Sequence, residues 1–281
     1  MQKHYLTSGQ IKAFERYLHQ EERAPATVKK YLRDLRDFMR WLGDKPVTKE
    51  AALDWKESLL AAGLTAVTVN GKISALNGLL SFIGWKECRI KFLRLQRRMF
   101  RERNRELTRN EYLRLLNAAR EMGKERLELL MEAICSTGIR VSEVQYLTVE
   151  AARNRQAVIN LKGKIRTILL PGKLCRKLLK FAAKQKNTSG EIFLTRSGQS
   201  LSRKQIWREM KKLCSQAGVE PSKVFPHNLR HLFAATFYRI CRDIVKLADV
   251  LGHSSIETTR IYLLATGAEH AKYLERLRLI C

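Results

Sequence analysis

Apolar residues recur every three to four positions along most of the chain, a spacing that places them on one face of an α-helix. Glycines at positions 43 and 63 fall between successive stretches of this kind, where a helix is expected to end. The first 90 residues are therefore expected to form a compact unit of four helices. The four predicted helices cover residues 9–19, 26–42, 48–62 and 66–84.

Helical spacing resumes in the second part of the chain. Thr108 and Glu111 have the spacing of a capping box, in which two side chains satisfy the free backbone N–H groups at a helix start. Helices are predicted at residues 109–121 and 124–136, and the chain is again helical in pattern from residue 202 onwards.

Two short runs of β-branched and aliphatic residues interrupt this helical pattern. They cover residues 157–161 and 166–170 and flank a short connection with a central glycine, which predicts a β-hairpin. Residues 192–194 (Ile-Phe-Leu) are a candidate third short strand. The predicted fold class is therefore mainly α with a small β-sheet, divided into a four-helix N-terminal domain and an α-rich C-terminal domain that carries the hairpin.

A basic stretch separates the two parts. Residues 93–105 combine poor apolar spacing with high positive charge, which is typical of an interdomain linker lying on an anionic surface. The alternative is the solvated face of a helix. We expect the N-terminal domain at residues 1–92, the linker at 93–105 and the C-terminal domain at 106–281.

The net charge indicates the kind of partner. The chain carries 54 Lys and Arg residues against 27 Asp and Glu residues, a formal charge of +27, and its sequence pI is about 10.2. Such an excess favours a polyanionic partner, and nucleic acid is the first candidate. A membrane is disfavoured, because no apolar run approaches the roughly 18 residues of a spanning helix.

The N-terminus and the cysteines indicate the compartment. The first five residues lack the apolar segment of a secretory signal, so we expect a cytoplasmic protein. The six cysteines include no CxxC pair, which favours reduced thiols and argues against a zinc site.

Taken one at a time, the polar residues that could carry chemistry have ordinary structural explanations. Arg140 follows the turn at Thr137-Gly138 and could point into a cleft, but an arginine there is most often solvated or paired. Lys162 and Lys164 flank the hairpin glycine, where a lysine usually lies in solvent.

The C-terminal part holds two more polar motifs. His227 and Arg230 are three residues apart and share one helix face, with His231 one turn beyond His227; the plain explanation is a basic helix with a core histidine. Residues 243–262 contain a helix, a glycine turn and a serine-capped second helix, as in a helix-turn-helix DNA reader. In that interpretation the protein is a regulator and Tyr262 is a core aromatic residue.

In combination, the order and spacing of these residues resemble the tyrosine recombinase (phage integrase) family, in its Xer-like two-domain form. The flanking residues match too: Thr-Gly-x-Arg-x-Ser-Glu at 137–143, His-x-Leu-Arg-His at 227–231, and Leu-Gly-His-x-Ser-x-x-Thr-Thr-x-x-Tyr at 251–262. Residues 26–42, with Thr-Val-x-x-Tyr-x-x-Asp-Leu at 27–35, look like that family's core-binding helical domain, so the resemblance covers nearly the whole chain. The family's catalytic set falls on Arg140, Lys162, His227, Arg230, His253 and Tyr262.

The resemblance implies a site-specific DNA recombinase that cleaves and rejoins strands through a 3′-phosphotyrosyl intermediate, for integration, excision or resolution of DNA. Tyr262 is then the nucleophile, and Arg140 and Arg230 hold the non-bridging phosphate oxygens. A hairpin lysine protonates the leaving 5′-oxygen; Lys162 matches that position, and Lys164 is the alternative. The chemistry implies no metal ion, no cofactor and no ATP.

The same resemblance gives roles to four more side chains. His227 is placed to act as a general acid or base, because it lies on the helix of Arg230. His253 is expected to hydrogen-bond a phosphate oxygen, and Glu143 to orient an arginine or His227. His231 has either a catalytic or a structural role.

Double-stranded DNA is the implied partner, and exchange between two duplexes needs four cleavages, hence a homotetramer. Helices near residues 65–80 and 201–212 are candidates for reading the DNA sequence. Residues 266–281 have an amphipathic pattern, which predicts a helix that docks on a neighbouring protomer or packs in cis. An accessory DNA-bending or directionality factor is a further possible partner. The linker arginines expected to lie against DNA phosphates are Arg94, Arg97, Arg98, Arg101, Arg103 and Arg105.

Two other functions use the same features. Type IB topoisomerases relax DNA as monomers by the same chemistry, and a helix-turn-helix regulator binds DNA without catalysis. Within the recombinases, the two-domain length fits both a Xer-like resolvase and the integrase of a compact mobile element.

Overall fold

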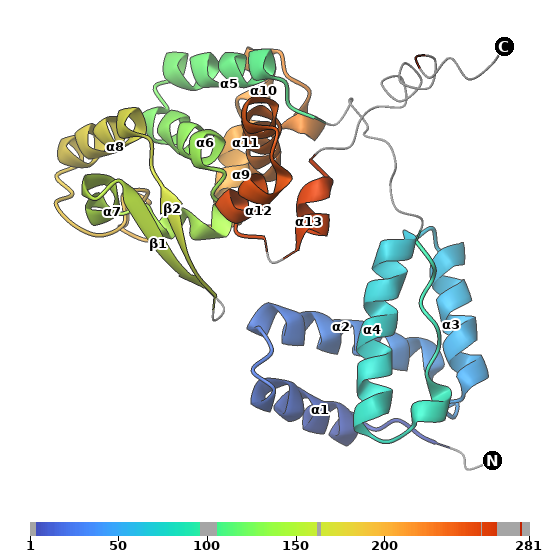
Figure 1. The fold of residues 1–281 in the computed structure, drawn as a ribbon. Helices are drawn as coiled ribbons and strands as arrows, with labels where there is room; N and C mark the ends of the chain where they lie inside the picture. Colours follow the sequence, from blue (N-terminus) through green and yellow to red (C-terminus); the bar gives the residue numbers. More distant parts are fainter. Residues whose placement is uncertain (1–3, 96–105, 162–163, 254, 263–275, 277–281) are drawn as a thin grey trace. The chain divides into compact units, whose positions relative to one another are not determined.

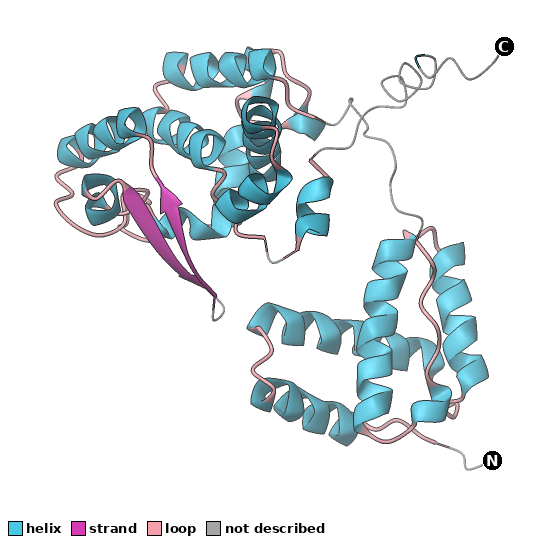
Figure 2. Ribbon diagram, in the orientation of Figure 1, coloured by secondary structure: helices cyan, strands magenta, loops and turns pink. Residues whose placement is uncertain are grey.

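The computed structural model describes residues 4–95, 106–161, 164–253, 255–262 and 276 (Figure 1). The chain separates into two compact units, residues 1–97 and 98–281. Most of the expected linker lies outside the described residues, so the predicted domain boundaries stay predictions. Helices dominate both units, and a single hairpin forms the sheet of the described residues (Figure 2). The predicted fold class, mainly α with a small β-sheet, is confirmed.

The N-terminal unit contains the four helices that the apolar spacing predicts. Thr7, Thr48 and Thr65 cap three of them, because each threonine hydroxyl accepts a hydrogen bond from the backbone N–H three residues further on. The elements are α1 (Ser8–Gln20), α2 (Pro25–Leu42), α3 (Lys49–Ala61), α4 (Ala66–Phe82) and the short 3₁₀ helix η1 (Lys86–Cys88).

Two asparagines on α4 hold the chain segment that leaves this unit. Asn77 donates from Nδ2 to the carbonyl of Ile90 at 2.8 Å and accepts from its N–H at 3.1 Å. Asn70 binds both backbone groups of Leu93 in the same way, at 2.9 and 2.8 Å. The segment is thus paired to α4 by side-chain amides.

The unit's core includes Phe14, Leu35, Phe38, Trp55 and Leu76, which are all buried.

The C-terminal unit is built around α6, which packs against α5, α8, α9 and α11. Most of its buried apolar residues form one large core, which includes Leu130, Ile134, Leu178, Phe193 and Leu229. The elements are α5 (Arg109–Glu121), α6 (Glu125–Thr137), η3 (Val141–Tyr146), α7 (Val149–Arg153), β1 (Gln156–Leu161), β2 (Lys164–Leu169), α8 (Gly172–Lys184), α9 (Arg203–Lys211), α10 (Cys214–Ala217), η4 (Pro221–Lys223), α11 (Pro226–Cys241), α12 (Ile244–Leu251) and α13 (Ile256–Arg260).

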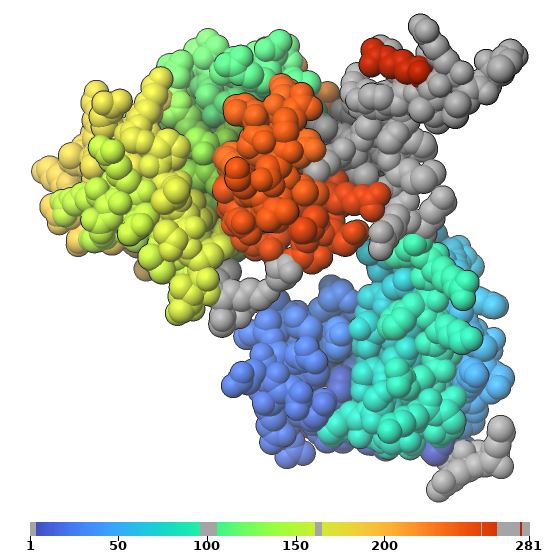
Figure 3. All heavy atoms as spheres, in the orientation of Figure 1, coloured from blue at the N-terminus to red at the C-terminus, as the bar shows by residue number. Residues whose placement is uncertain are grey.

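The hairpin pairs β1 and β2 in antiparallel register, from Gln156 opposite Leu169 to Leu161 opposite Lys164. Side chains alternate between its faces, so Ile168 is buried while its neighbour Leu169 is exposed. In the space-filling view the hairpin lies beside the C-terminal helices, yellow-green next to orange-red (Figure 3).

The expected third strand at residues 192–194 is wrong. Ile192 and Phe193 are buried in the core, as their apolar side chains suggested, but their backbone forms no ladder. Only isolated bridges flank them, from Thr148 to Glu191 and from Leu194 to Ser200. Burial therefore accounts for the apolar run without strand pairing.

No helix among the described residues has both the length and the apolar character needed to cross a membrane.

Candidate active site

A cavity of about 900 Å³ in the C-terminal unit brings together most of the residues singled out from the sequence. It lies between the start of η3, α9, the start of α11 and the turn that joins α12 to α13. Trp207, Arg203 and Lys204 of α9 also line it; they belong to the helix expected to read DNA and were not among the predicted catalytic residues. The predicted residues in its lining are Arg140, His227, Arg230, His253 and Tyr262.

Arg230, in the second turn of α11, is the most enclosed of these, with only 2% of its surface exposed. Its Nη1 donates to the carbonyl of Gly138, and its Nη2 donates to the carbonyl of Leu251 at 2.8 Å and to Nε2 of His253 at 2.9 Å. Burial, and then the charge of Arg140, lower the pKa of Arg230 to about 10. The guanidinium therefore stays protonated at neutral pH.

Arg140 stands immediately before η3 and is held by Glu143 at both ends of the residue. Its backbone N–H donates to Oε2 of Glu143 at 2.8 Å, and its Nη1 donates to Oε1 at 2.9 Å. Its Nη2 lies 3.4 Å from the carbonyl of Gly252. With 38% of its side chain exposed, Arg140 keeps donors available on the cavity side.

The tight turn before Arg140 depends on a glycine. Gly138 adopts the left-handed conformation, with φ of 65°, at the C-cap of α6. A Cβ there would lie 2.5 Å from the ring of Phe233 on α11. The missing side chain thus allows the close approach of α11, which carries Arg230.

Glu143 is buried yet ionised, because it is shared by two arginines. Burial alone raises the pKa of its carboxyl group, but the Arg140 N–H bond and the charge of Arg166 lower it below its ordinary value. Arg166 donates from Nη2 to Oε2 of Glu143 at 2.5 Å. The expected partner of Glu143 was an arginine or His227, and the structure places Arg140 and Arg166 against it.

Arg166 and Thr259 are two site residues that the sequence reasoning missed. For Arg166, a signal was present: side chains alternate along a strand, so Arg166 shares the inward face of β2 with Ile168. Thr259 is fully buried on α13; it is the second threonine of the motif at 251–262, but the motif alone gave this side chain no role.

His253 is bound on both sides of its ring. Arginine has no acceptor, so Nε2 of His253 must be unprotonated to accept from Nη2 of Arg230 at 2.9 Å. Nδ1 then carries the hydrogen and donates it to Oγ1 of Thr259 at 2.8 Å. Both nitrogens thus bind protein groups, and the expected bond from His253 to a DNA phosphate stays a prediction.

His253 should remain neutral far below the usual range of an imidazole. Burial, and then the charges of Arg230 and Arg140, lower its pKa to about 4. We expect an NMR titration of the free protein to show the neutral Nδ1–H ring down to about that pH. A midpoint close to the ordinary value of about 6.5 would contradict this electrostatic description.

The same shift predicts how stability depends on pH. The unfolded imidazole takes up its proton near pH 6.5, whereas the folded ring resists protonation, so the free energy of unfolding falls as the pH drops through this window. His253→Gln should therefore lose less stability than the parent protein between about pH 6.5 and 4. If the free energy of unfolding falls equally with pH in the parent and in His253→Gln, His253 does not contribute to the pH dependence of stability.

Tyr262 lies two residues after the end of α13, and only 4% of its surface is exposed. Its ring makes an edge contact with His231, at 4.4 Å between centroids, and stacks on His253 at 5.9 Å. It also packs with Ala234, Leu247 and Leu251 in a small apolar cluster separate from the large core. The phenol is thereby fixed beside the cavity that the two arginines line.

His227 lies at the rim of the cavity, in the first turn of α11. Its ring contacts that of His231 edge-on, at 4.6 Å between centroids. One side of His227 is open to solvent. Partial burial of the rest of the ring, and then the charges of Arg230 and Arg140, lower the pKa of His227. A neutral imidazole at neutral pH is able to accept a proton.

Several predicted residues lie outside the described part of the chain. Lys162 is one, and Lys164 is placed only by its backbone at the start of β2. Of the linker arginines, Arg94 is described and exposed. The proposed docking helix at 266–281 is also outside, apart from residue 276. The remaining linker arginines, all outside, are Arg97, Arg98, Arg101, Arg103 and Arg105.

A group of metal-ligand types occurs elsewhere in the described residues. His4, Glu87 and Cys88 of the N-terminal unit have ligand atoms within 4.8 Å of one another. His4 Nε2 is 2.9 Å from Glu87 Oε1, and Cys88 donates to the carbonyl of Val47. These ordinary contacts account for the group, and none of its members lines the cavity.

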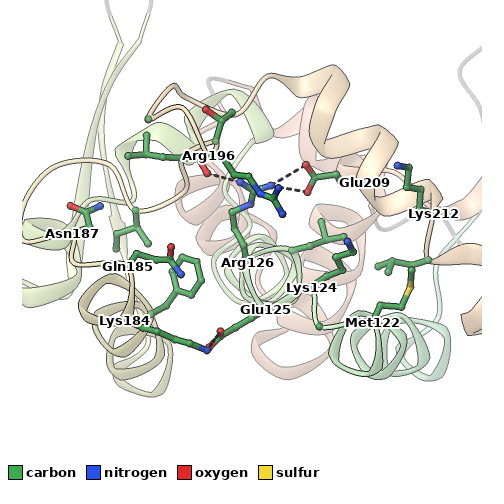
Figure 4. Close-up of a pocket in the computed structure, with 18 residues that line it drawn as sticks. Met122, Lys124, Glu125, Arg126, Lys184, Gln185, Asn187, Arg196, Glu209 and Lys212 are labelled. Atoms are coloured by element: carbon green, nitrogen blue, oxygen red, sulfur yellow. Dashed lines mark hydrogen bonds and ion pairs between the residues drawn. The ribbon is translucent and has the colours of Figure 1, made fainter.

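A second cavity, of about 730 Å³, opens at the other end of α6 (Figure 4). Arg126 crosses it to bind Glu209 on α9 at 3.0 Å and the carbonyl of Leu194 at 2.6 Å. Lys184 pairs with Glu125 at 2.5 Å. None of the predicted catalytic residues lines this second cavity.

The match to known families covers both units. Residues 105–268 match the Phage integrase family, and residues 11–87 match the Phage integrase, N-terminal SAM-like domain. Tyrosine recombinase XerA of Pyrococcus furiosus is 28% identical over 289 residues, which cover 100% of this chain and 98% of that protein. Tyrosine recombinase XerA of Thermococcus kodakarensis is 29% identical over 96% of this chain and 95% of its own length.

A solved structure shares the architecture. A lambda integrase tetramer bound to a Holliday junction superposes with a TM-score of 0.73 at 19% identity, over 92% of this chain and 77% of that chain. At this identity the likeness concerns the fold.

Proposed function

Because the chain belongs to the phage integrase family of tyrosine recombinases, we propose that Tyr262 attacks a DNA phosphodiester bound in the 900 Å³ cavity. The observation that carries this proposal is the shared lining: the phenol of Tyr262 and the guanidiniums of Arg140 and Arg230 face one space. A buried phenol beside two fixed cations is suited to attack on an anionic ester.

The proposed step exchanges one phosphate ester for another. The Tyr262 oxygen attacks phosphorus in line with the bond to the 5′-oxygen, forms a 3′-phosphotyrosyl ester and releases a 5′-hydroxyl. The phenol loses one proton and the departing oxygen gains one. A 5′-hydroxyl of a partner strand then reverses the step, so the strand is rejoined without ATP.

Arg140 and Arg230 supply the electrostatic stabilisation. Negative charge builds on the non-bridging oxygens in the transition state, and planar guanidiniums can hold both oxygens in a bidentate manner. Their donors are positioned in advance by Glu143, His253 and backbone carbonyls, so little reorganisation is needed when the charge develops.

The protons are assigned to two other groups. His227 accepts the phenolic proton, directly or through a water, because its lowered pKa keeps it neutral at neutral pH. Lys162, which lies between β1 and β2 in the sequence, donates the proton to the leaving 5′-oxygen, since an alkoxide is a poor leaving group.

Lys162→Ala should slow strand cleavage by about 100-fold or more on an ordinary duplex. A bridging 5′-sulfur at the scissile position leaves without protonation, so the same variant should cleave that substrate close to the parental rate. The matched control is Lys164→Ala, which should cleave both substrates normally. If sulfur rescues Lys164→Ala instead, the acid is Lys164; if it rescues neither, another group donates the proton.

Recombination requires DNA and more than one protomer. The charge of +27 supports binding along duplex phosphates, to which the linker arginines, Arg94 among them, would contribute. Two exchanged duplexes need four cleavages, so we propose a homotetramer on paired sites, with residues 266–281 docking on a neighbouring protomer. The lambda integrase structure, a tetramer on a Holliday junction, is a solved example of such an assembly in a protein of similar fold.

The decisive test is capture of the covalent intermediate. A nicked duplex that loses the short strand after cleavage should trap the protein as an adduct that survives denaturant, and in the presence of EDTA. Relaxation of a plasmid without a specific site would indicate topoisomerase-type activity. Tight binding without any adduct would instead favour the helix-turn-helix regulator and overturn the proposal.

A further inference from the structure

The C-terminus of α12 is the point on which three arginines converge. The carbonyl of Leu251 accepts from Nη1 of Arg166 and from Nη2 of Arg230. The next carbonyl, that of Gly252, accepts from Nη2 of Arg140 at 3.4 Å. Carbonyls at a helix end lack partners within the helix and carry partial negative charge, so they are suitable anchors for guanidinium groups.

Arg166 reaches both proposed phosphate-binding arginines through shared partners. It shares the carboxylate of Glu143 with Arg140: Oε1 binds Arg140 at 2.9 Å and Oε2 binds Arg166 at 2.5 Å. It shares the Leu251 carbonyl with Arg230. Arg166 itself is not among the residues that line the cavity.

Two further observations concern the surroundings of Arg166. A Cβ on Gly252 would lie 2.4 Å from Cδ of Arg166, so the turn before His253 leaves no room for a side chain. Among buried side-chain nitrogen and oxygen atoms of the described residues, Nε of Arg166 alone lacks a hydrogen-bond partner. A buried, unpaired donor on an arginine that lies near two other arginines is unfavourable for folding, which points to a role in the reaction.

We propose that Arg166 is a positioning residue that fixes the guanidiniums of Arg140 and Arg230 through Glu143 and the Leu251 carbonyl. The proposal rests on the function proposed above, in which these two arginines hold the phosphate. Without Arg166, Glu143 loses one of two ion pairs and the end of α12 loses one of its cations. Arg140 and Arg230, which together form the proposed phosphate clamp, are then free to shift. A misplacement of their guanidiniums by about 1 Å is expected to lower the cleavage rate on the order of 100-fold.

The test compares Arg166→Met and Arg166→Lys with the parent in single-turnover cleavage at saturating DNA. Arg166→Met should cleave about 100-fold more slowly. Arg166→Lys keeps the charge near Glu143 but cannot also span to the Leu251 carbonyl, so it should lose about 10-fold. DNA affinity should stay within about threefold, since no more than one weak phosphate contact is at stake. The matched control, Arg176→Met, removes the same group from the exposed face of α8 and should cleave normally.

A second substrate separates positioning from a general structural defect. A methylphosphonate at the scissile position removes one non-bridging negative charge and so reduces the need for the clamp. The gap between parent and Arg166 variants should therefore shrink at least about 10-fold on this substrate, while it should persist on the bridging 5′-sulfur substrate. If Arg166→Met does not fold, as judged by circular dichroism, Arg166→Lys carries the comparison.

Each outcome decides the proposal. Parental cleavage by Arg166→Met, or an unchanged gap on the methylphosphonate, would overturn it. Closure of the gap on the 5′-sulfur substrate would also overturn it, because Arg166 would then act on the hairpin lysine. If the parent itself forms no covalent adduct, the proposed function fails first, and that failure is visible before any Arg166 variant is measured.

Discussion

Tyr262→Phe is expected to abolish the covalent protein–DNA adduct, by at least about 10⁴-fold relative to the parent, while DNA binding is kept. Phenylalanine preserves the ring that contacts His231 and His253 and packs in the small apolar cluster. It removes only the hydroxyl that must become esterified. The fold and the arginine network should therefore remain intact, and the loss of chemistry should be nearly complete.

The measurement is adduct formation on the nicked duplex, resolved on a denaturing gel, together with a binding assay on the same DNA. Tyr238→Phe is the matched control, because Tyr238 packs against the same apolar cluster from α11. It should form the adduct at the parental level. An adduct that persists in Tyr262→Phe would show that another residue is the nucleophile.

Arg140→Lys is expected to lower the cleavage rate by about 10²–10³-fold without a comparable loss of DNA affinity. Arg140 uses separate nitrogens for Glu143 and for the Gly252 carbonyl and still has donors left for a phosphate. A lysine carries all its donors on one atom, Nζ, so it is not able to bind Glu143 and a DNA phosphate with the geometry of an arginine at the same time. The charge is retained, which separates geometry from electrostatic attraction.

Single-turnover cleavage at saturating DNA gives the rate, and the salt dependence of binding reports the number of phosphate contacts. Since 38% of the Arg140 side chain is exposed, we expect the substitution to change the melting temperature little. Near-parental cleavage by Arg140→Lys would exclude the bidentate clamp.

The sequence was sufficient for the helices that have one apolar face and clear caps. The first four predicted helices differ from α1 to α4 by at most two residues at each end, and Thr108 and Glu111 form the expected capping box. The helix, glycine turn and serine cap expected within 243–262 are also present, as α12, Gly252 and Ser255. In these segments local spacing and capping determine the structure, so no knowledge of distant contacts is needed.

The parts that could not be predicted depend on contacts between distant segments. Arg166 becomes part of the site only because β2 approaches η3 and the end of α12, which are 23 and 85 residues away in the sequence. Thr259 matters because its hydroxyl meets His253, which fixes the tautomer. Residues 192–194 were mistaken for a strand because an apolar run shows that a segment is buried and does not show what its backbone pairs with.

The small apolar cluster that contains Tyr262 has a consequence for regulation. Ala234, Leu247, Leu251 and Tyr262 form a cluster of their own, apart from the large core of the same unit. Detaching α13 together with Tyr262 should disturb this small cluster and leave the large core folded. We therefore expect the phenol to be displaced more easily than the C-terminal unit unfolds, so a ligand that binds α12 or α13 should lower strand cleavage without unfolding the unit.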